Sequence, residues 1–131
     1  MTGIVAAGLG CRKGCGAEEI VALVRTAMDH ADLPMNGLSG LFTPAFKHGE
    51  TGVGEAARLL GLPLVLIPEP MMKAAEPRAV TRSERVIALT GLASVAETAA
   101  LAGAGPASRL IQKRIASKNA TCAIAVSGDY A

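Results

Sequence analysis

Residues 4–31, IVAAGLGCRKGCGAEEIVALVRTAMDHA, contain the pattern that decides the fold. The run 4–7 is short, apolar and partly β-branched, which is typical of a buried strand. The glycine-rich stretch 8–16 that follows is interpreted as a loop. From Ala17 onward, apolar residues recur at helical spacing, at Ile20, Leu23, Val24, Ala27, Met28 and Ala31. A strand, a loop and an amphipathic helix in this order predict the first unit of an α/β domain.

The rest of the chain continues with strand and helix patterns in alternation. Polar or breaker-rich stretches interrupt them at 43–52 and at 68–82, the second with at most one helical turn around 71–75. Further strands are expected at 37–42, 62–68, 110–115 and 120–126, and further helices at 53–60, 84–90 and 96–104. This order predicts a three-layer α/β/α sandwich. Its mainly parallel mixed sheet has about five strands and carries a C-terminal antiparallel hairpin.

Composition limits the classes of function. The 131 residues are 50% hydrophobic with a formal net charge of +2, which predicts a single domain, 1–131, that needs no disulfide or structural metal. The small charge and the three aromatic residues argue against a nucleic-acid partner. The longest uncharged apolar run, 59–68, is half of the ~20 residues that a membrane span requires. Because no cationic leader opens the chain, we expect a cytoplasmic protein with reduced thiols and no membrane partner.

The stretch 8–14, GLGCRKG, is the strongest local signal for a binding site. Glycines at the end of a strand let a ligand approach the backbone, and a following helix N-terminus favours anions. The candidate residues are Gly8, Gly10, Arg12, Lys13 and Gly14. The stretch lacks the ending of a P-loop and the third glycine of a dinucleotide fingerprint. We predict an anion-binding loop for phosphate or carboxylate; the alternative is a glycine-rich turn with solvent-facing cations.

A second polar loop follows the second expected strand. It contains Thr43, Lys47, His48 and Glu50. The carboxyl ends of strands in an open α/β sheet are where ligands bind, and Glu50 or His48 could act there as a general acid or base. The alternative interpretation is an exposed polar loop without a catalytic role.

Three further groups of residues have structural explanations. Cys11 and Cys15 lack the second ligand pair of a zinc site, so buried or loop thiols are expected, with neither metal nor cofactor. Ser94 and Glu97 match a helix capping box, and Ser83 matches an N-cap. The hairpin carries a cationic patch that is either a solvated face or a surface for an acidic small molecule: Arg109, Lys113, Arg114 and Lys118.

Taken together, these blocks resemble the CobE family of cobalamin (vitamin B12) biosynthesis and the related C-terminal domain of CbiG, the cobalt-precorrin-5A hydrolase. The resemblance spans most of the chain. It rests on five blocks in order: GLGCRKG at 8–14, the loop 42–55 with Thr43, Lys47 and Glu50, RSERV at 82–86, GLASVAETAAL at 91–101, and Lys113 followed by TCAIAV at 121–126.

The resemblance implies a ligand as well as a pathway. Precorrins are macrocycles rimmed with carboxylates, which Arg12 could bind bidentately and Lys13, Lys47 and Lys113 as point charges. Thr43, Ser83 and Glu97 complete the substrate-binding residues that the matching blocks imply. Three hypotheses remain open at this stage. The protein binds a precorrin or corrinoid intermediate; or it is a pathway enzyme that opens a lactone with Glu50 or His48; or it is a non-catalytic module that docks onto another enzyme of the pathway.

Overall fold

The computed structural model describes residues 3–45, 51–81 and 94–128. Predictions for Lys47, His48, Glu50, Ser83 and the helix 84–90 lie outside these residues. The helices and strands follow the chain in this order: β1 (Val5–Cys11), α1 (Ala17–His30), η1 (Met35–Gly37), β2 (Gly40–Pro44), α2 (Thr51–Leu60), β3 (Leu64–Ile67), α3 (Glu69–Ala75), η3 (Glu76–Arg78), α5 (Val95–Ala104), β4 (Arg109–Ala116) and β5 (Ala120–Val126).

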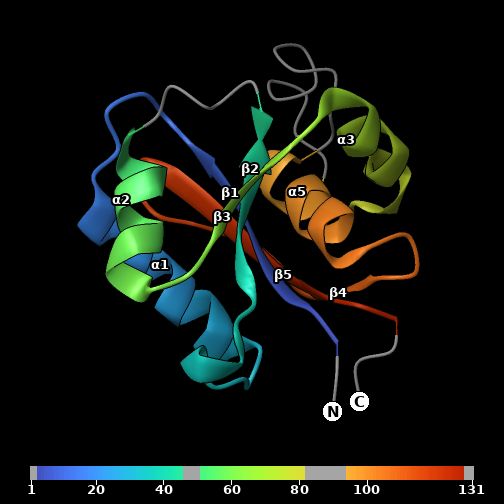
Figure 1. Cartoon of the computed structure of the whole chain (residues 1–131), viewed down its shortest axis with the longest axis horizontal. Coiled ribbons are helices and arrows are strands. Elements are labelled where there is room, and N and C mark those ends of the chain that lie inside the picture. The colour runs from blue at the N-terminus through green and yellow to red at the C-terminus, as the bar shows by residue number, and fades with distance from the viewer. Residues whose placement is uncertain (1–2, 46–50, 82–93, 129–131) are drawn as a thin grey trace.

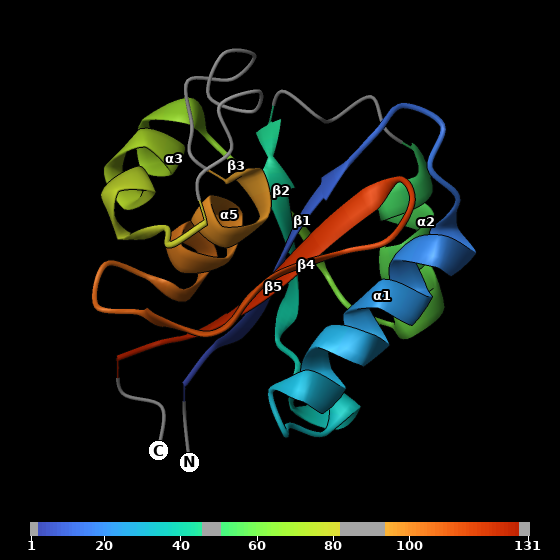
Figure 2. The ribbon, with the colours of Figure 1, turned by 180° about the vertical axis from the view of Figure 1, so that it is seen from behind.

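One five-stranded sheet with the order β3-β2-β1-β5-β4 forms the middle layer. Strands β1, β2 and β3 are parallel, and β5 is antiparallel to both β1 and β4. Helices α1 and α2 cover one face of the sheet, while α3 and α5 cover the other (Figures 1 and 2). The predicted α/β class, the parallel strands and the C-terminal hairpin are therefore confirmed.

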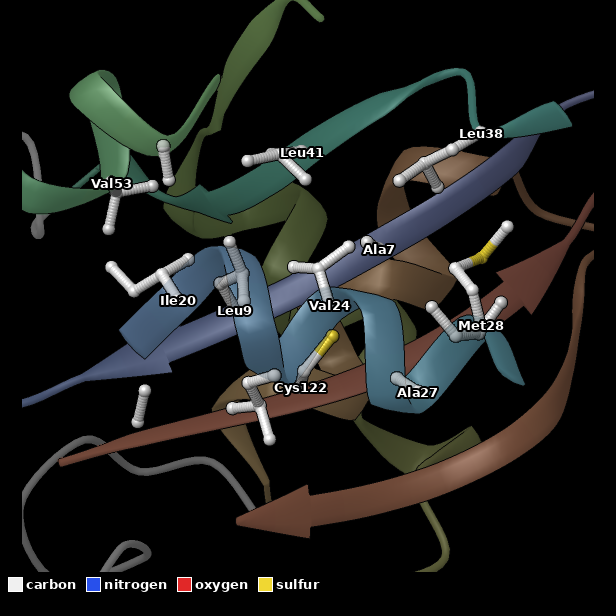
Figure 3. Close-up of a cluster of buried hydrophobic side chains, with 14 of the residues drawn as sticks. Ala7, Leu9, Ile20, Val24, Ala27, Met28, Leu38, Leu41, Val53 and Cys122 are labelled. Atoms are coloured by element: carbon white, nitrogen blue, oxygen red, sulfur yellow. The ribbon is translucent and has the colours of Figure 1, made fainter. Parts of the chain in front are cut away.

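The two faces of β1 differ in side-chain size, and this difference shapes the core. Leu9 packs with Val24 and Leu41 under α1 and α2, in a cluster of large aliphatic side chains (Figure 3). The opposite face of β1 has only alanine and glycine, and there the alanine-rich helix α5 lies directly on the strand. Small residues on both elements allow this close approach, which larger side chains would prevent.

Two predicted boundaries are wrong. The expected loop 8–16 begins four residues too early, because β1 continues to Cys11 and pairs with β5 along its whole length. The connection 68–82 contains a seven-residue helix, α3, where at most one turn was expected. Pro70 is compatible with the first turn of a helix, and Met72 and Ala75 bury one side of α3 against the core.

No helix in the described part of the chain is long and apolar enough to cross a membrane.

Candidate functional site

Gly10, Arg12, Lys13, Gly14 and Thr43, among the sequence-predicted site residues, lie at or near one edge of the sheet, which we call the carboxyl edge. The parallel strands β1, β2 and β3 all end there (Figure 1). The β4–β5 turn, 117–119, lies at the same edge because Cys11 pairs with Ala120. Helix α5 begins there too, since a Cβ atom on Gly10 would meet Val95 at 3.4 Å. Carboxyl edges of this kind are the usual ligand sites of α/β sheets.

Residues 12–16 form the loop after β1 and carry two cationic side chains. Arg12, Lys13 and Gly14 are exposed. Among residues 3–45, 51–81 and 94–128, no carboxylate pairs with the guanidinium of Arg12 or the ammonium of Lys13. Gly14 has a φ of +83°, a left-handed conformation that favours glycine. The loop therefore presents two positive charges to solvent that have no carboxylate partner in the described part of the chain.

Backbone hydrogen bonds hold this loop in place. The Arg12 N–H donates to the Asn119 carbonyl at 2.8 Å, and the Cys15 N–H donates to the Arg12 carbonyl at 3.1 Å. The first bond joins the loop to the β4–β5 turn. These two bonds fix the backbone of the loop, whereas the exposed side chains of Arg12 and Lys13 extend from it.

Glu19, in the first turn of α1, strengthens the same connection. Its Oε2 accepts hydrogen bonds from the Ser117 hydroxyl and from the Asn119 N–H, the latter at 2.7 Å, and its Oε1 accepts from Asn119 Nδ2 at 3.0 Å. These bonds, with that from Ser117 the largest influence, lower the pKa of Glu19 to about 2. Glu18 and Glu19 also place negative charge at the start of α1, which opposes the attraction of the helix dipole for an anion.

We expect the Glu19 contacts to make stability depend on pH. A carboxylate whose pKa falls from 4.5 to about 2 on folding stabilises the protein above pH 4.5, and this contribution is lost as the pH falls towards 2. Glu19→Gln should therefore be less stable than the wild type at pH 7, and the difference should shrink below pH 4.5. Urea unfolding at several pH values measures this. A difference that stays constant from pH 7 to pH 3 would contradict the assignment.

Gly8 and Gly10 lie inside β1 rather than in the loop. The backbone of Gly8 is flanked by β2 and β5, and its Cα faces the backbone of α5. Gly10 faces Thr121 and Val95. The close packing of α5 against β1 thus explains Gly8, and the pattern of residues along the chain did not predict this packing.

Thr43 is also a buried residue of a strand rather than a loop residue. Its side chain is buried near the end of β2, and its hydroxyl donates to the Leu9 carbonyl at 3.0 Å. This bond links β2 to β1 at the carboxyl edge.

Glu97 is a fully buried carboxylate near the start of α5. Its Oε1 accepts from the Val80 N–H at 2.9 Å and the Thr81 N–H at 2.7 Å. Its Oε2 accepts from the Thr81 hydroxyl at 2.6 Å and the Arg114 N–H at 2.9 Å. Burial alone would raise the pKa of Glu97, but the bonds from Arg114, Thr81 and Val80 outweigh it and lower the pKa. The carboxylate is thus occupied by the chain's own backbone and by Thr81.

The predicted capping box is half confirmed. The Ser94 hydroxyl accepts from the Glu97 N–H at 3.3 Å, as expected for an N-cap. The reciprocal bond from the Glu97 carboxylate to the start of the helix is replaced by its bonds to Val80, Thr81 and Arg114. The Glu97 carboxylate therefore binds residues distant in the sequence instead of the N-terminal backbone of its own helix.

Lys113 is exposed on the edge strand β4, beside the half-buried Arg114. Neither side chain forms an ion pair with a described residue. The thiols of Cys11, Cys15 and Cys122 are buried and form no disulfide, and burial raises the pKa of Cys122 to about 12. Within the described residues, no three metal-ligating side chains come together.

Sequence reasoning missed several residues that build this edge. From the sequence alone, Glu19 is an acidic residue in the first turn of a helix, Ser117 and Asn119 are turn residues, and Thr81 has no signal. A serine and an asparagine in a hairpin turn are a weak signal for a side-chain acceptor nearby. The identity of that acceptor is not a local property of the sequence.

Comparison with known proteins agrees with this architecture. Residues 5–125 match the family described as cobalamin synthesis G C-terminus. The chain is 35% identical to the protein CobE of Sinorhizobium sp. over 118 residues, which cover 90% of this chain and 77% of the relative.

Solved structures give the same result. CobE, a protein from the cobalamin (vitamin B12) biosynthetic pathway, superposes with a TM-score of 0.88 at 30% identity, covering 96% of this chain and 92% of CobE. Cobalamin biosynthesis protein chiG from Agrobacterium tumefaciens superposes with a TM-score of 0.77 at 35% identity, and the match covers 96% of this chain and 100% of chiG. A putative cobalamin biosynthesis protein G homolog from Sulfolobus solfataricus shares the fold, with a TM-score of 0.68 at 23% identity. The match covers 94% of this chain and 36% of the homolog. The chain therefore belongs to the cobalamin synthesis G C-terminus family, which includes CobE, and is a protein of cobalamin biosynthesis.

Proposed function

We propose that this protein binds a precorrin or corrinoid tetrapyrrole intermediate of cobalamin biosynthesis at the carboxyl edge. Membership of the family supports the pathway. The proposal that the ligand is a carboxylate-bearing tetrapyrrole rests on the exposed cations Arg12 and Lys13. They have no ion-pair partner among the described residues and lie on a loop whose backbone is held by hydrogen bonds.

The chemistry of such a ligand fits this arrangement. Tetrapyrrole intermediates carry acetate and propionate side chains around an apolar ring. A guanidinium can hold one carboxylate through two parallel hydrogen bonds, and an ammonium adds a point charge beside it. The proposal places the protein in the cytoplasm, where its three thiols stay reduced.

Removing both cations should release the ligand. The purified protein is mixed with precorrin intermediates or with cobyrinic acid, a corrin with free carboxylate side chains, and passed through a desalting column. The visible spectrum reports the pigment that travels with the protein. Arg12→Ala with Lys13→Ala should weaken binding about ten- to a hundredfold, since hydrogen bonds to charged groups contribute about 1.5–3 kcal/mol.

A matched control separates this site from net charge. Arg25→Ala with Lys73→Ala removes the same two charges from the exposed surfaces of α1 and α3, and should leave binding within about twofold. Equal losses in both double variants would overturn the site. If the wild type retains no pigment, the proposed function fails.

Mass analysis of the eluted pigment distinguishes a binding protein from an enzyme. An unchanged mass is expected here. A mass change that is lost in Glu50→Gln or His48→Ala would instead identify the hydrolase-type activity that the resemblance also implies.

A further inference from the structure

Strand β4 contains a bulge at Lys113 and Arg114. Gln112 pairs with Ile124 and Ile115 pairs with Cys122, so Lys113 and Arg114 together face the single residue Ala123. A bulge interrupts the ladder hydrogen bonds and changes the direction of the side chains that it contains. In this protein the backbone N–H of Arg114 donates to Glu97 Oε2 at 2.9 Å.

The same carboxylate holds a third segment of the chain. Glu97 also accepts from the backbone N–H groups of Val80 and Thr81 and from the Thr81 hydroxyl. One side chain on α5 thus connects the β4 bulge with residues 80–81. Because a buried carboxylate without partners is strongly unfavourable, each of these bonds resists rearrangement.

The bulge carries the positive charges of Lys113 and Arg114. Lys113 is exposed and Arg114 half-buried, and neither has an ion-pair partner among the described residues. Charged side chains and a bulge both protect an exposed edge strand from pairing with another chain, but that protection does not need a buried acid that holds the bulge. The cost of burying Glu97 is explained if the direction of these two cations matters.

We propose that Glu97 is a positioning residue, which holds the β4 bulge so that Lys113 and Arg114 form a second carboxylate-binding point, separate from the one at Arg12 and Lys13. This inference rests on the proposed function and extends it: the ligand must offer carboxylates to two separate points, as an oligocarboxylate macrocycle does. Glu97 itself does not contact the ligand.

A double-mutant cycle tests whether Glu97 acts through the two cations. The probe is cobyrinic acid, and its dissociation constant is measured from the pigment spectrum at a temperature where every variant is folded. Glu97→Gln should weaken binding roughly tenfold, the size of one lost charged contact. In a protein that already carries Lys113→Ala and Arg114→Ala, the same change should have no further effect.

Arg78 supplies the matched structural control. Its guanidinium donates to the Ser108 carbonyl at 2.7 Å, the Ser108 hydroxyl at 3.0 Å and the Gly105 carbonyl at 3.3 Å. These bonds join Arg78 to the residues that follow the C-terminal end of α5, whereas Glu97 lies near its N-terminal end. Arg78→Met therefore removes a connection at the end of α5 that does not hold the bulge. It should lower stability while changing the dissociation constant less than twofold.

Two outcomes would overturn the inference. Glu97→Gln and Arg78→Met could weaken binding equally, or the effect of Glu97→Gln could remain in full after Lys113 and Arg114 are replaced. Either result would leave Glu97 as a packing residue. If Glu97→Gln does not fold, Thr81→Val removes the hydroxyl bond to the carboxylate and should weaken binding of cobyrinic acid less than Glu97→Gln would.

Amide hydrogen exchange tests the positioning without a ligand. In Glu97→Gln the amides of Val80, Thr81 and Arg114 should exchange faster together, whereas in Arg78→Met the Arg114 amide should be unchanged. Unaltered exchange at Arg114 would overturn the inference. Failure of the wild type to bind cobyrinic acid, with the exchange result intact, would instead disprove the proposed function and the second binding point while leaving the link between the segments.

Discussion

Gly8→Ala is expected to lower the free energy of unfolding by about 3 kcal/mol or more, a large part of the roughly 5–15 kcal/mol available to a domain. A Cβ atom at this position would lie 2.0 Å from the Ala96 carbonyl oxygen and 2.4 Å from the Ala100 nitrogen. Both are backbone atoms of α5, so no side-chain rotation can relieve the overlap. The helix would have to move away from β1, which opens the core on that face.

Gly10→Ala is the matched control for this prediction. Gly10 lies two residues along the same strand, on the same face, but its added Cβ would meet the Thr121 hydroxyl at 2.8 Å and Val95 Cγ1 at 3.4 Å. These are side-chain atoms that can shift, so a loss below about 1 kcal/mol is expected. Urea unfolding gives both midpoints. If the two variants are equally stable, α5 does not lie on β1 as closely as described.

The second large effect is expected at Gly52, near the start of α2. A Cβ atom there would lie 2.0 Å from the Cys15 carbonyl oxygen. Cys15 belongs to the loop 12–16, so Gly52→Ala must displace either α2 or the loop that carries Arg12 and Lys13. We expect a loss of about 2 kcal/mol in the free energy of unfolding, and weaker binding of cobyrinic acid if the proposed function holds.

Gly54→Ala tests whether position or helix composition causes this loss. Gly54 lies in the same helix, but nothing lies within 4 Å of its added Cβ. Alanine is favoured over glycine inside a helix, so Gly54→Ala should raise the free energy of unfolding by about 0.5–1 kcal/mol. The two substitutions in α2 should thus change stability in opposite directions. A gain in both would show that Gly52 does not contact Cys15.

The elements that the sequence predicted correctly are those with strong local patterns. The stripe from Ile20 to Met28 predicted α1 because helical spacing of apolar residues shows within a few turns. The two runs around residues 117–119 predicted β4 and β5 for a similar reason. The resemblance to the CobE and CbiG families likewise rested on residues in short, ordered blocks, and the family comparison confirmed it.

The errors occurred where packing overrides local preference. Glycines at 8 and 10 suggested a loop, since glycine weakens a strand. In the folded protein both lie inside β1: Gly8 is required there because the backbone of α5 leaves no room for a side chain, whereas Gly10 faces only the side chains of Thr121 and Val95. Residues 68–82 suggested an exposed connection, but burial of Met72 and Ala75 under the sheet stabilises α3.

The sequence by itself determined the α/β class, the family and the cationic loop at Arg12 and Lys13, since each depends on residues that are neighbours in the chain. Only the tertiary structure showed that Glu19 holds the β4–β5 turn and that Glu97 holds the β4 bulge. Asn119 is 100 residues from Glu19, and Arg114 is 17 residues from Glu97. Such hydrogen bonds leave no periodic pattern, because folding alone brings the donor and the acceptor together.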